Sequence, residues 1–229
     1  MSPVVDATSP DSRHEAVQAA AAAVRTGGLV VMPTDTVYGI GCDAFDRDAV
    51  ARLLEAKGRD REMPPPVLVG DVKTLDGLAT DVRPYVRDLV EAFWPGPLTV
   101  IVHAQPSLQW DLGETKGTVA LRMPDDEAAL DLLREVGPMA VTSANRTGGP
   151  PAHSVLEAAT ALGAAVEVYL DGGPRADLAP STILDCTGAE PAVLRLGSLD
   201  ADRINTVAKL HSHHDVPEPE PEPDDPEIE

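Results

Sequence analysis

The chain contains few cysteines and few aromatic residues. Cys42 and Cys186 are the only cysteines in 229 residues, and neither has a Cys or His nearby at the spacing of a zinc site. Two cysteines do not make the framework of a disulfide-stabilised protein, so we expect both to be reduced packing residues. Because aromatic residues make up 3% of the chain and apolar residues 43%, the core must consist mainly of Ala, Val and Leu.

Long apolar runs are missing as well. No stretch approaches the roughly 18 apolar residues of a membrane span. The first residues also lack the basic segment and apolar core of a signal peptide. We therefore expect a cytoplasmic protein with no membrane contact.

Basic residues are outnumbered, with 18 Lys and Arg against 38 Asp and Glu and a net charge of -20. This balance argues against broad nucleic-acid binding, which depends on neutralising phosphates. From Asp215 onward there are eight acidic residues and no Lys or Arg, and alternating Pro and Glu cannot build a core. We predict one domain over residues 1–209 and a disordered acidic tail over 210–229. Three histidines near the start of this tail are interpreted as a surface tract in preference to a metal site: His211, His213 and His214.

Helix and strand patterns alternate along the body. The apolar spacing and turn residues predict helices over residues 12–25, 46–56, 72–78, 82–93, 126–136 and 155–162. Ser12 and Glu15 are predicted to form a capping box. Strands are predicted over residues 29–32, 67–69, 98–103, 118–123, 139–142, 166–170, 181–185 and 193–196. The alternation predicts an α/β fold, and the hairpin-like spacing of the last two strands indicates a mixed sheet.

Three hydroxyl groups and a carboxylate follow the first predicted strand. They belong to Thr34, Asp35, Thr36 and Tyr38. In open α/β sheets the carboxyl ends of strands are where small ligands usually bind, and such loops carry function more often than cores do. An ordinary polar turn is the competing interpretation.

The segment PTDTVYG at residues 33–39 closely resembles the signature of the YrdC-like L-threonylcarbamoyladenylate synthase family, with further matching segments from about Gly27 to Gly197. The resemblance implies a YrdC-like fold, a twisted open sheet with flanking helices around a concave cavity. It also implies a tRNA-modification enzyme that condenses L-threonine, bicarbonate or CO2, and ATP with Mg2+ into L-threonylcarbamoyladenylate, releasing pyrophosphate. The product would pass to a separate tRNA threonylcarbamoyl transferase complex, and direct tRNA contact stays open.

The resemblance also implies roles for dispersed polar residues. A KxR motif supplies Lys57 and Arg59 as the catalytic cations. ATP is assigned to Arg59, Thr118, Asn145, His153 and Arg195. L-threonine is assigned to Thr36, Arg122, Ser143 and Ser181. Each has a structural alternative, such as a helix-end cation, a buried ion pair or a helix cap. No metal ligand and no dedicated general base is evident.

Two positions depart from the family pattern. Met63 stands where the family commonly has Asn or Ser, and Leu68 where it often has His. Arg61 or backbone groups could supply the missing contacts. These departures support an alternative function, a noncatalytic RNA-binding or assembly module of the same fold. A carbamoyl-transferring domain that uses carbamoyl phosphate is a third interpretation, although such domains usually belong to longer chains.

Overall fold

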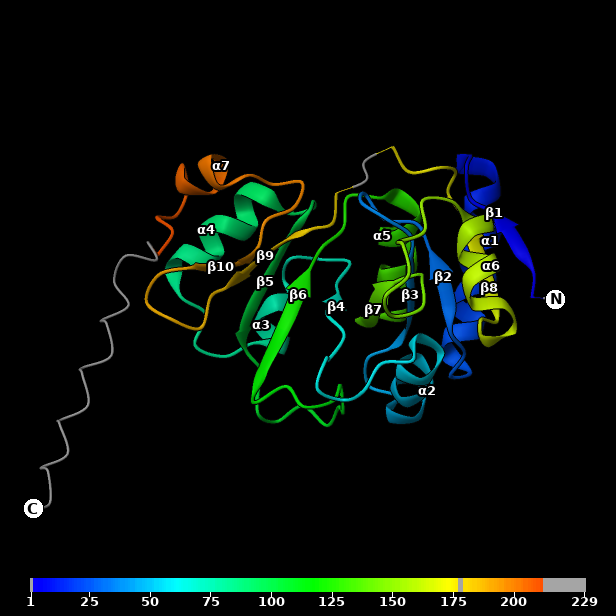
Figure 1. The fold of residues 1–229 in the computed structure, drawn as a ribbon, viewed down its shortest axis with the longest axis horizontal. Helices are drawn as coiled ribbons and strands as arrows, with labels where there is room; N and C mark the ends of the chain where they lie inside the picture. The colour runs from blue at the N-terminus through cyan, green and yellow to red at the C-terminus, as the bar shows by residue number, and fades with distance from the viewer. Residues whose placement is uncertain (1, 177–178, 212–229) are drawn as a thin grey trace, which may run out of the picture.

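The computed structural model of this chain describes residues 2–176 and 179–211, where ten strands form one sheet with helices on both faces (Figure 1). The strands are β1 (Val4–Asp6), β2 (Val30–Met32), β3 (Gly39–Asp43), β4 (Val67–Leu68), β5 (Leu98–His103), β6 (Thr118–Arg122), β7 (Met139–Ser143), β8 (Val168–Asp171), β9 (Thr182–Asp185) and β10 (Ala192–Arg195). The helices are α1 (Pro10–Arg25), α2 (Arg47–Lys57), α3 (Thr74–Leu78), α4 (Pro84–Phe93), α5 (Glu127–Val136), α6 (Val155–Leu162) and α7 (Ala201–Asn205), with a 3-10 turn η1 (Gly163–Ala165). Most of the predicted tail, with His213 and His214, lies outside the described residues.

The sheet is mixed, as predicted. Its strands follow the order β1-β8-β2-β3-β7-β4-β6-β5-β9-β10. Pairs such as β4 with β6 and β5 with β9 are parallel, whereas β3 with β7 and β5 with β6 are antiparallel. Segments far apart in the sequence therefore become neighbours at the centre of the sheet.

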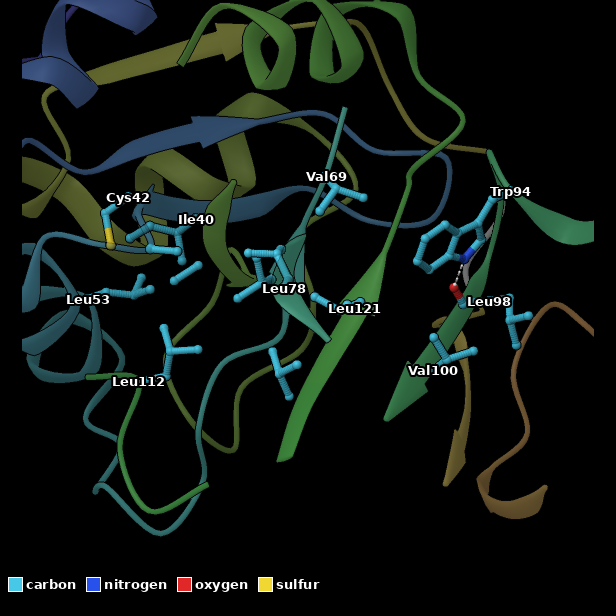
Figure 2. Packing of buried hydrophobic residues seen from close by; sticks show 14 of the residues in the cluster. Ile40, Cys42, Leu53, Val69, Leu78, Trp94, Leu98, Val100, Leu112 and Leu121 are labelled. Carbon is cyan, nitrogen blue, oxygen red and sulfur yellow. Dashed lines mark hydrogen bonds between the residues drawn. The ribbon is translucent and has the colours of Figure 1, made fainter. Parts of the chain in front are cut away.

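Two apolar clusters pack on the two faces of the sheet. The larger cluster lies under α2, α3, α4 and α6, and Figure 2 shows Ile40, Leu53, Leu78 and Leu121 within it. The second cluster lies under α1 and α5 and receives side chains from β2, β4, β7 and β8. No described residue of β5, β6 or β9 belongs to this second cluster. On that face these three strands are available to line a cavity.

The sequence patterns do not predict β1, β3 or α7. Strand β3 escapes prediction because Gly39 and Gly41 disfavour a strand by propensity. Packing explains both glycines, since an added Cβ would lie 2.6 Å from Val141 Cγ1 at Gly39 and 2.7 Å from Val141 Cγ2 at Gly41. The glycines thus let Val141 of the neighbouring strand lie across β3.

The predicted capping box of Ser12 and Glu15 is wrong. Helix α1 begins at Pro10, and Ser9 is its N-cap, whose side chain accepts a hydrogen bond from the Ser12 backbone N–H at 3.2 Å. Proline at the first helical position suits this earlier start, because its missing N–H would have no partner there. The other predicted elements agree with the structure to within two residues at each end. No described helix has the length and apolar character needed to cross a membrane.

Candidate functional site

A cavity of about 570 Å³ lies against the face of the central strands that is opposite the larger apolar cluster. Alternation along β6 places Thr118, Ala120 and Arg122 in the lining and Leu121 in the apolar cluster, whereas Val119 belongs to the cluster and also borders the cavity. The volume falls in the range of small-molecule sites. Eight of the predicted site residues line this cavity: Thr36, Arg59, Thr118, Arg122, Ser143, Asn145, Ser181 and Arg195. Lys57 and His153 do not belong to the lining.

Arg122 is almost fully buried and is bound on several sides. Its Nε donates to the Gly96 carbonyl at 3.1 Å, and its Nη1 and Nη2 donate to Thr36 Oγ1 at 3.2 and 3.3 Å. Nη2 also donates to Asp35 Oδ1 at 2.5 Å, which makes a buried ion pair. Burial lowers the pKa of Arg122, and Asp35 opposes that shift. Arg122 thus both forms the ion pair considered as a structural alternative and lines the cavity.

The available protons decide which partner donates in the hydrogen bond between the Thr34 and Thr36 hydroxyls. Thr34 Oγ1 donates its single proton to the Val37 carbonyl at 2.6 Å. Thr36 must therefore be the donor in the 3.1 Å contact between the Thr34 and Thr36 hydroxyls. The lone pairs of Thr36 Oγ1 are then free to accept from Arg122, in agreement with the observed contacts.

A second guanidinium group lies near Arg122. Arg195 donates from Nε and Nη2 to the Ser181 carbonyl at 3.1 and 2.8 Å, and from Nη2 to Ser181 Oγ at 3.2 Å. Ser181 Oγ in turn lies 3.0 Å from Thr99 Oγ1. Burial and the neighbouring charge of Arg122 lower the pKa of Arg195. Two nearby cations make this end of the cavity suitable for an anion.

Lys57 lies beneath the turn that carries Ser143 and Asn145. Its Nζ donates to the Ser143 carbonyl at 2.6 Å, to Asn145 Oδ1 at 2.8 Å and to the Asn145 carbonyl. Ser143 Oγ donates to Asn145 Oδ1 at 2.6 Å. Burial, with a smaller contribution from the charge of Arg59, lowers the pKa of Lys57 to about 8. In this structure the ammonium group therefore binds the turn, and the turn lines the cavity.

Arg59 has the opposite environment. It lines the cavity, and its buried Nε has no hydrogen-bond partner in the part of the chain that the structure describes. Burial lowers the pKa of Arg59, and Asp60 opposes the shift. Two residues later, Arg61 is half-exposed, pairs with Asp111 at 2.5 Å and is not part of the lining. Arg59 thus lines the cavity and keeps a buried N–H without a partner among the described residues, whereas Arg61 does neither.

Of the remaining positions considered in the sequence, His153 and Met63 lie outside the cavity lining and Leu68 lies within it. His153 is half-buried with Nδ1 unpaired among the described residues, and its backbone N–H and carbonyl bind Glu157 and Arg175. Met63 is exposed outside the lining, whereas Leu68 is buried and lines the cavity. The departure at Leu68 therefore changes the cavity wall, and the one at Met63 does not.

The sequence patterns do not identify Arg175, which supports the Thr34–Tyr38 loop. Arg175 Nη1 donates to the Thr34 carbonyl at 3.1 Å and to Asp126 Oδ2 at 2.7 Å, and its guanidinium lies 5.6 Å from the Tyr38 ring centroid. The only sequence signal is an Arg in the Gly-Gly-Pro stretch that follows β8. The contacts that give it importance join residues far apart in the chain.

The described lining of the cavity contains three arginines and no Asp or Glu. No group of three or more His, Cys, Asp or Glu side chains within residues 2–176 and 179–211 could hold a metal ion. The cavity can therefore bind anions through guanidinium, hydroxyl and amide groups. A metal ion in it would be coordinated mainly by oxygen atoms of a ligand and by water.

Comparison with known proteins gives consistent results. The Sua5/YciO/YrdC family model, described as "Telomere recombination", matches residues 22–197. A Mycobacterium tuberculosis protein, provisionally named threonylcarbamoyl-AMP synthase, is 53% identical over 90% of this chain and 95% of its own length. The threonylcarbamoyl-AMP synthase of Bacillus subtilis is 37% identical over 89% of this chain and 60% of its own.

A solved structure has the same fold. The crystal structure of P. abyssi Sua5 complexed with L-threonine has a TM-score of 0.86 and 33% identity, and the match covers 92% of this chain. This chain spans 63% of that longer protein. The likeness therefore extends over nearly the whole described fold, including the strands that line the cavity.

Proposed function

Because this chain belongs to the Sua5/YciO/YrdC family, we propose that it is a threonylcarbamoyl-AMP synthase that condenses L-threonine, bicarbonate or CO2, and ATP. The observation that carries this proposal is the convergence of eight polar side chains from separate segments on one cavity. We propose further that the enzyme works in the cytoplasm and passes its product to a tRNA threonylcarbamoyl transferase complex.

The amino-acid end of the cavity would be formed by Arg122 and Ser181. A guanidinium group suits a carboxylate, and Arg195 nearby adds a second positive charge. The hydroxyl of Ser143 lies in the same lining and would accept from the amine of threonine, whereas Thr36, whose hydroxyl is occupied by Thr34 and Arg122, would act by holding Arg122. The α-amine would form a carbamate with CO2 and release a proton.

The nucleotide end would be formed by Arg59, Thr118, Asn145 and Arg195. A carbamate oxygen would form a bond to the α-phosphorus of ATP while the bond to pyrophosphate breaks. The guanidinium group of Arg59 lines the cavity and would offset the charge on these phosphates. Lys57 would contribute by holding the turn of Ser143 and Asn145 in place.

Magnesium would enter as part of the MgATP substrate. The described lining offers no carboxylate, so phosphate oxygens and water would supply most of its ligands. The chemistry then depends on positioning and on neutralising charge, and it requires no strong protein nucleophile.

The test is a direct assay of purified protein with ATP, magnesium, bicarbonate and labelled L-threonine. We expect threonylcarbamoyl-AMP and pyrophosphate to appear only when all four components are present. Product that forms without threonine or bicarbonate would contradict the proposal. Retained ATP binding without any product would support the noncatalytic alternative, with attention to Leu68 in the cavity wall.

A further inference from the structure

Asp35 directly follows Thr34 in the loop after β2, and Arg122 is the only polar partner that the described residues give to its carboxylate. Oδ1 accepts from Arg122 Nη2 at 2.5 Å. Oδ2 is buried and has no hydrogen-bond partner in the part of the chain that the structure describes. The two side chains of the pair are 14% and 8% exposed. The carboxylate of Asp35 is thus committed to one guanidinium group.

Stability does not explain this arrangement well. A buried ion pair often contributes little net stability, because desolvation offsets the attraction between the charges. A buried carboxylate oxygen without a partner adds a further cost. The cost falls at the wall of the cavity, since Arg122 is one of its lining residues. A role in binding is therefore the better explanation of the pair.

The donors of Arg122 show what that role is. Of its five N–H groups, one on Nε is taken by Gly96, two by Thr36 and one on Nη2 by Asp35. The remaining N–H, on Nη1, has no acceptor among the described residues. Asp35 and Thr36 therefore hold the guanidinium plane in one orientation and leave one donor for a ligand.

We propose that Asp35 is a positioning residue, which orients the Arg122 guanidinium so that its remaining N–H binds the carboxylate of the amino-acid substrate. The proposal rests on the proposed function. Asp35 acts through Arg122 and does not itself contact the reacting atoms. It sets the affinity for the amino acid and leaves the affinity for ATP unchanged.

Hydrogen bonds that do not involve the Asp35 side chain also hold the loop around Asp35. A variant that shortens this side chain can therefore be interpreted. The Thr34 carbonyl accepts from Arg175, the Thr34 hydroxyl donates to the Val37 carbonyl, and the Thr36 N–H donates to Thr34 Oγ1 at 3.2 Å. None of these bonds uses the Asp35 side chain. Removing that side chain should free Arg122 without releasing the loop.

The experiment compares Asp35→Ala and Asp35→Asn with wild type in the adenylate assay, varying threonine and ATP separately. For Asp35→Ala we expect the threonine KM to rise roughly 10- to 100-fold, which corresponds to losing one hydrogen bond to a charged group. The ATP KM should be unchanged. Asp35→Asn keeps an oxygen that can accept from Nη2, so it should recover most of the loss.

A matched control and a competitor sharpen the test. Asp76→Asn removes the charge from an exposed pair with Arg87, neither residue of which lines the cavity, and should behave as wild type. L-threonine amide, which lacks the carboxylate, should compete equally well against wild type and Asp35→Ala. Should Asp35→Ala not fold, Asp35→Ser, which is too short to reach Nη2, takes its place.

Three results would overturn the inference. They are an unchanged threonine KM in the truncated variant, an equal rise in both KM values, and tighter threonine binding, which would make Asp35 a competitor of the substrate carboxylate. Wild-type protein without threonine-dependent product would instead defeat the proposed function. The two failures are therefore distinguishable.

Discussion

Leu121 and Arg122 are consecutive residues of β6 that serve opposite faces of the sheet. Leu121 is fully buried in the larger apolar cluster, where Figure 2 shows it with other aliphatic side chains. Arg122 lines the cavity and is bound by Asp35 and Thr36. One strand thus supplies stability from one face and ligand binding from the other. Substitutions on the two faces should therefore separate stability from activity.

The largest effect is expected on the apolar face. Leu121→Ala should lower the free energy of unfolding by about 2–5 kcal/mol, because it leaves a cavity among fully buried neighbours. Chemical denaturation measures this change. The threonine and ATP KM values of the protein that remains folded should equal those of wild type. A raised threonine KM with unchanged stability would contradict this division between the two faces of β6.

Arg59→Ala tests the contribution of a cavity-lining arginine to catalysis. We expect a loss of roughly 10²–10³ in turnover, since one preorganised donor to developing charge is removed. The melting temperature should hardly change. Arg61→Ala is the matched control, because Arg61 is half-exposed and pairs with Asp111 outside the lining. Near-normal turnover of Arg59→Ala would contradict the assigned role.

Arg122→Lys tests whether the planar guanidinium group of Arg122, the residue after Leu121, is needed in addition to its charge. Lysine keeps the positive charge near Asp35 but cannot hold Asp35, Thr36 and a ligand in one plane. We expect the threonine KM to rise about tenfold or more, with a smaller change in stability than Leu121→Ala causes. Steady-state kinetics with threonine varied at saturating ATP gives the answer. Equal damage to threonine and ATP affinity would indicate a purely structural Arg.

The last prediction concerns the pH dependence of stability through Lys57. Its pKa is about 8 in the folded protein, because burial disfavours the charge, against about 10.4 for a free lysine. Between these values the unfolded chain binds more protons, so stability should rise with pH from about 8 to about 10.4. Below pH 8 both states are protonated and this contribution is flat.

Thermal melts of wild type and Lys57→Met across this range measure the effect. The rise should be present in wild type and weaker in the variant, by up to about 1.4 kcal/mol for each unit of pKa difference. Lys73→Met is the control, since Lys73 is exposed before α3. An identical pH dependence of wild type and Lys57→Met would show that the pKa of Lys57 is close to that of free lysine.

Much of the secondary structure could be predicted from local sequence patterns. The helix at residues 155–162 and the strand at 98–103 were predicted with the bounds that the structure shows, because caps and apolar spacing mark their ends. Strand β3 could not be predicted, since its glycines make sense only against Val141 of another strand. The cap of α1 at Ser9 could not be predicted, because Ser9 and Ser12 are both serines that could cap a helix within one turn.

The candidate site was also partly predictable. The resemblance to the family points to ten site residues, and eight of them line one cavity. What each of them contacts could not be predicted. Lys57 and Arg59 look equivalent in the sequence, yet one is bound to the turn of Ser143 and Asn145 and the other has an unpaired Nε.

The sequence by itself determined the family, the alternating strands and helices, and the residue types available for binding anions. Only the tertiary structure decided which cation is committed and which is free, and that Asp35 holds Arg122 from 87 positions away in the chain. The physical reason is that burial and the choice of hydrogen-bond partner depend on how strands order themselves in the sheet. That order joins segments which no local pattern connects.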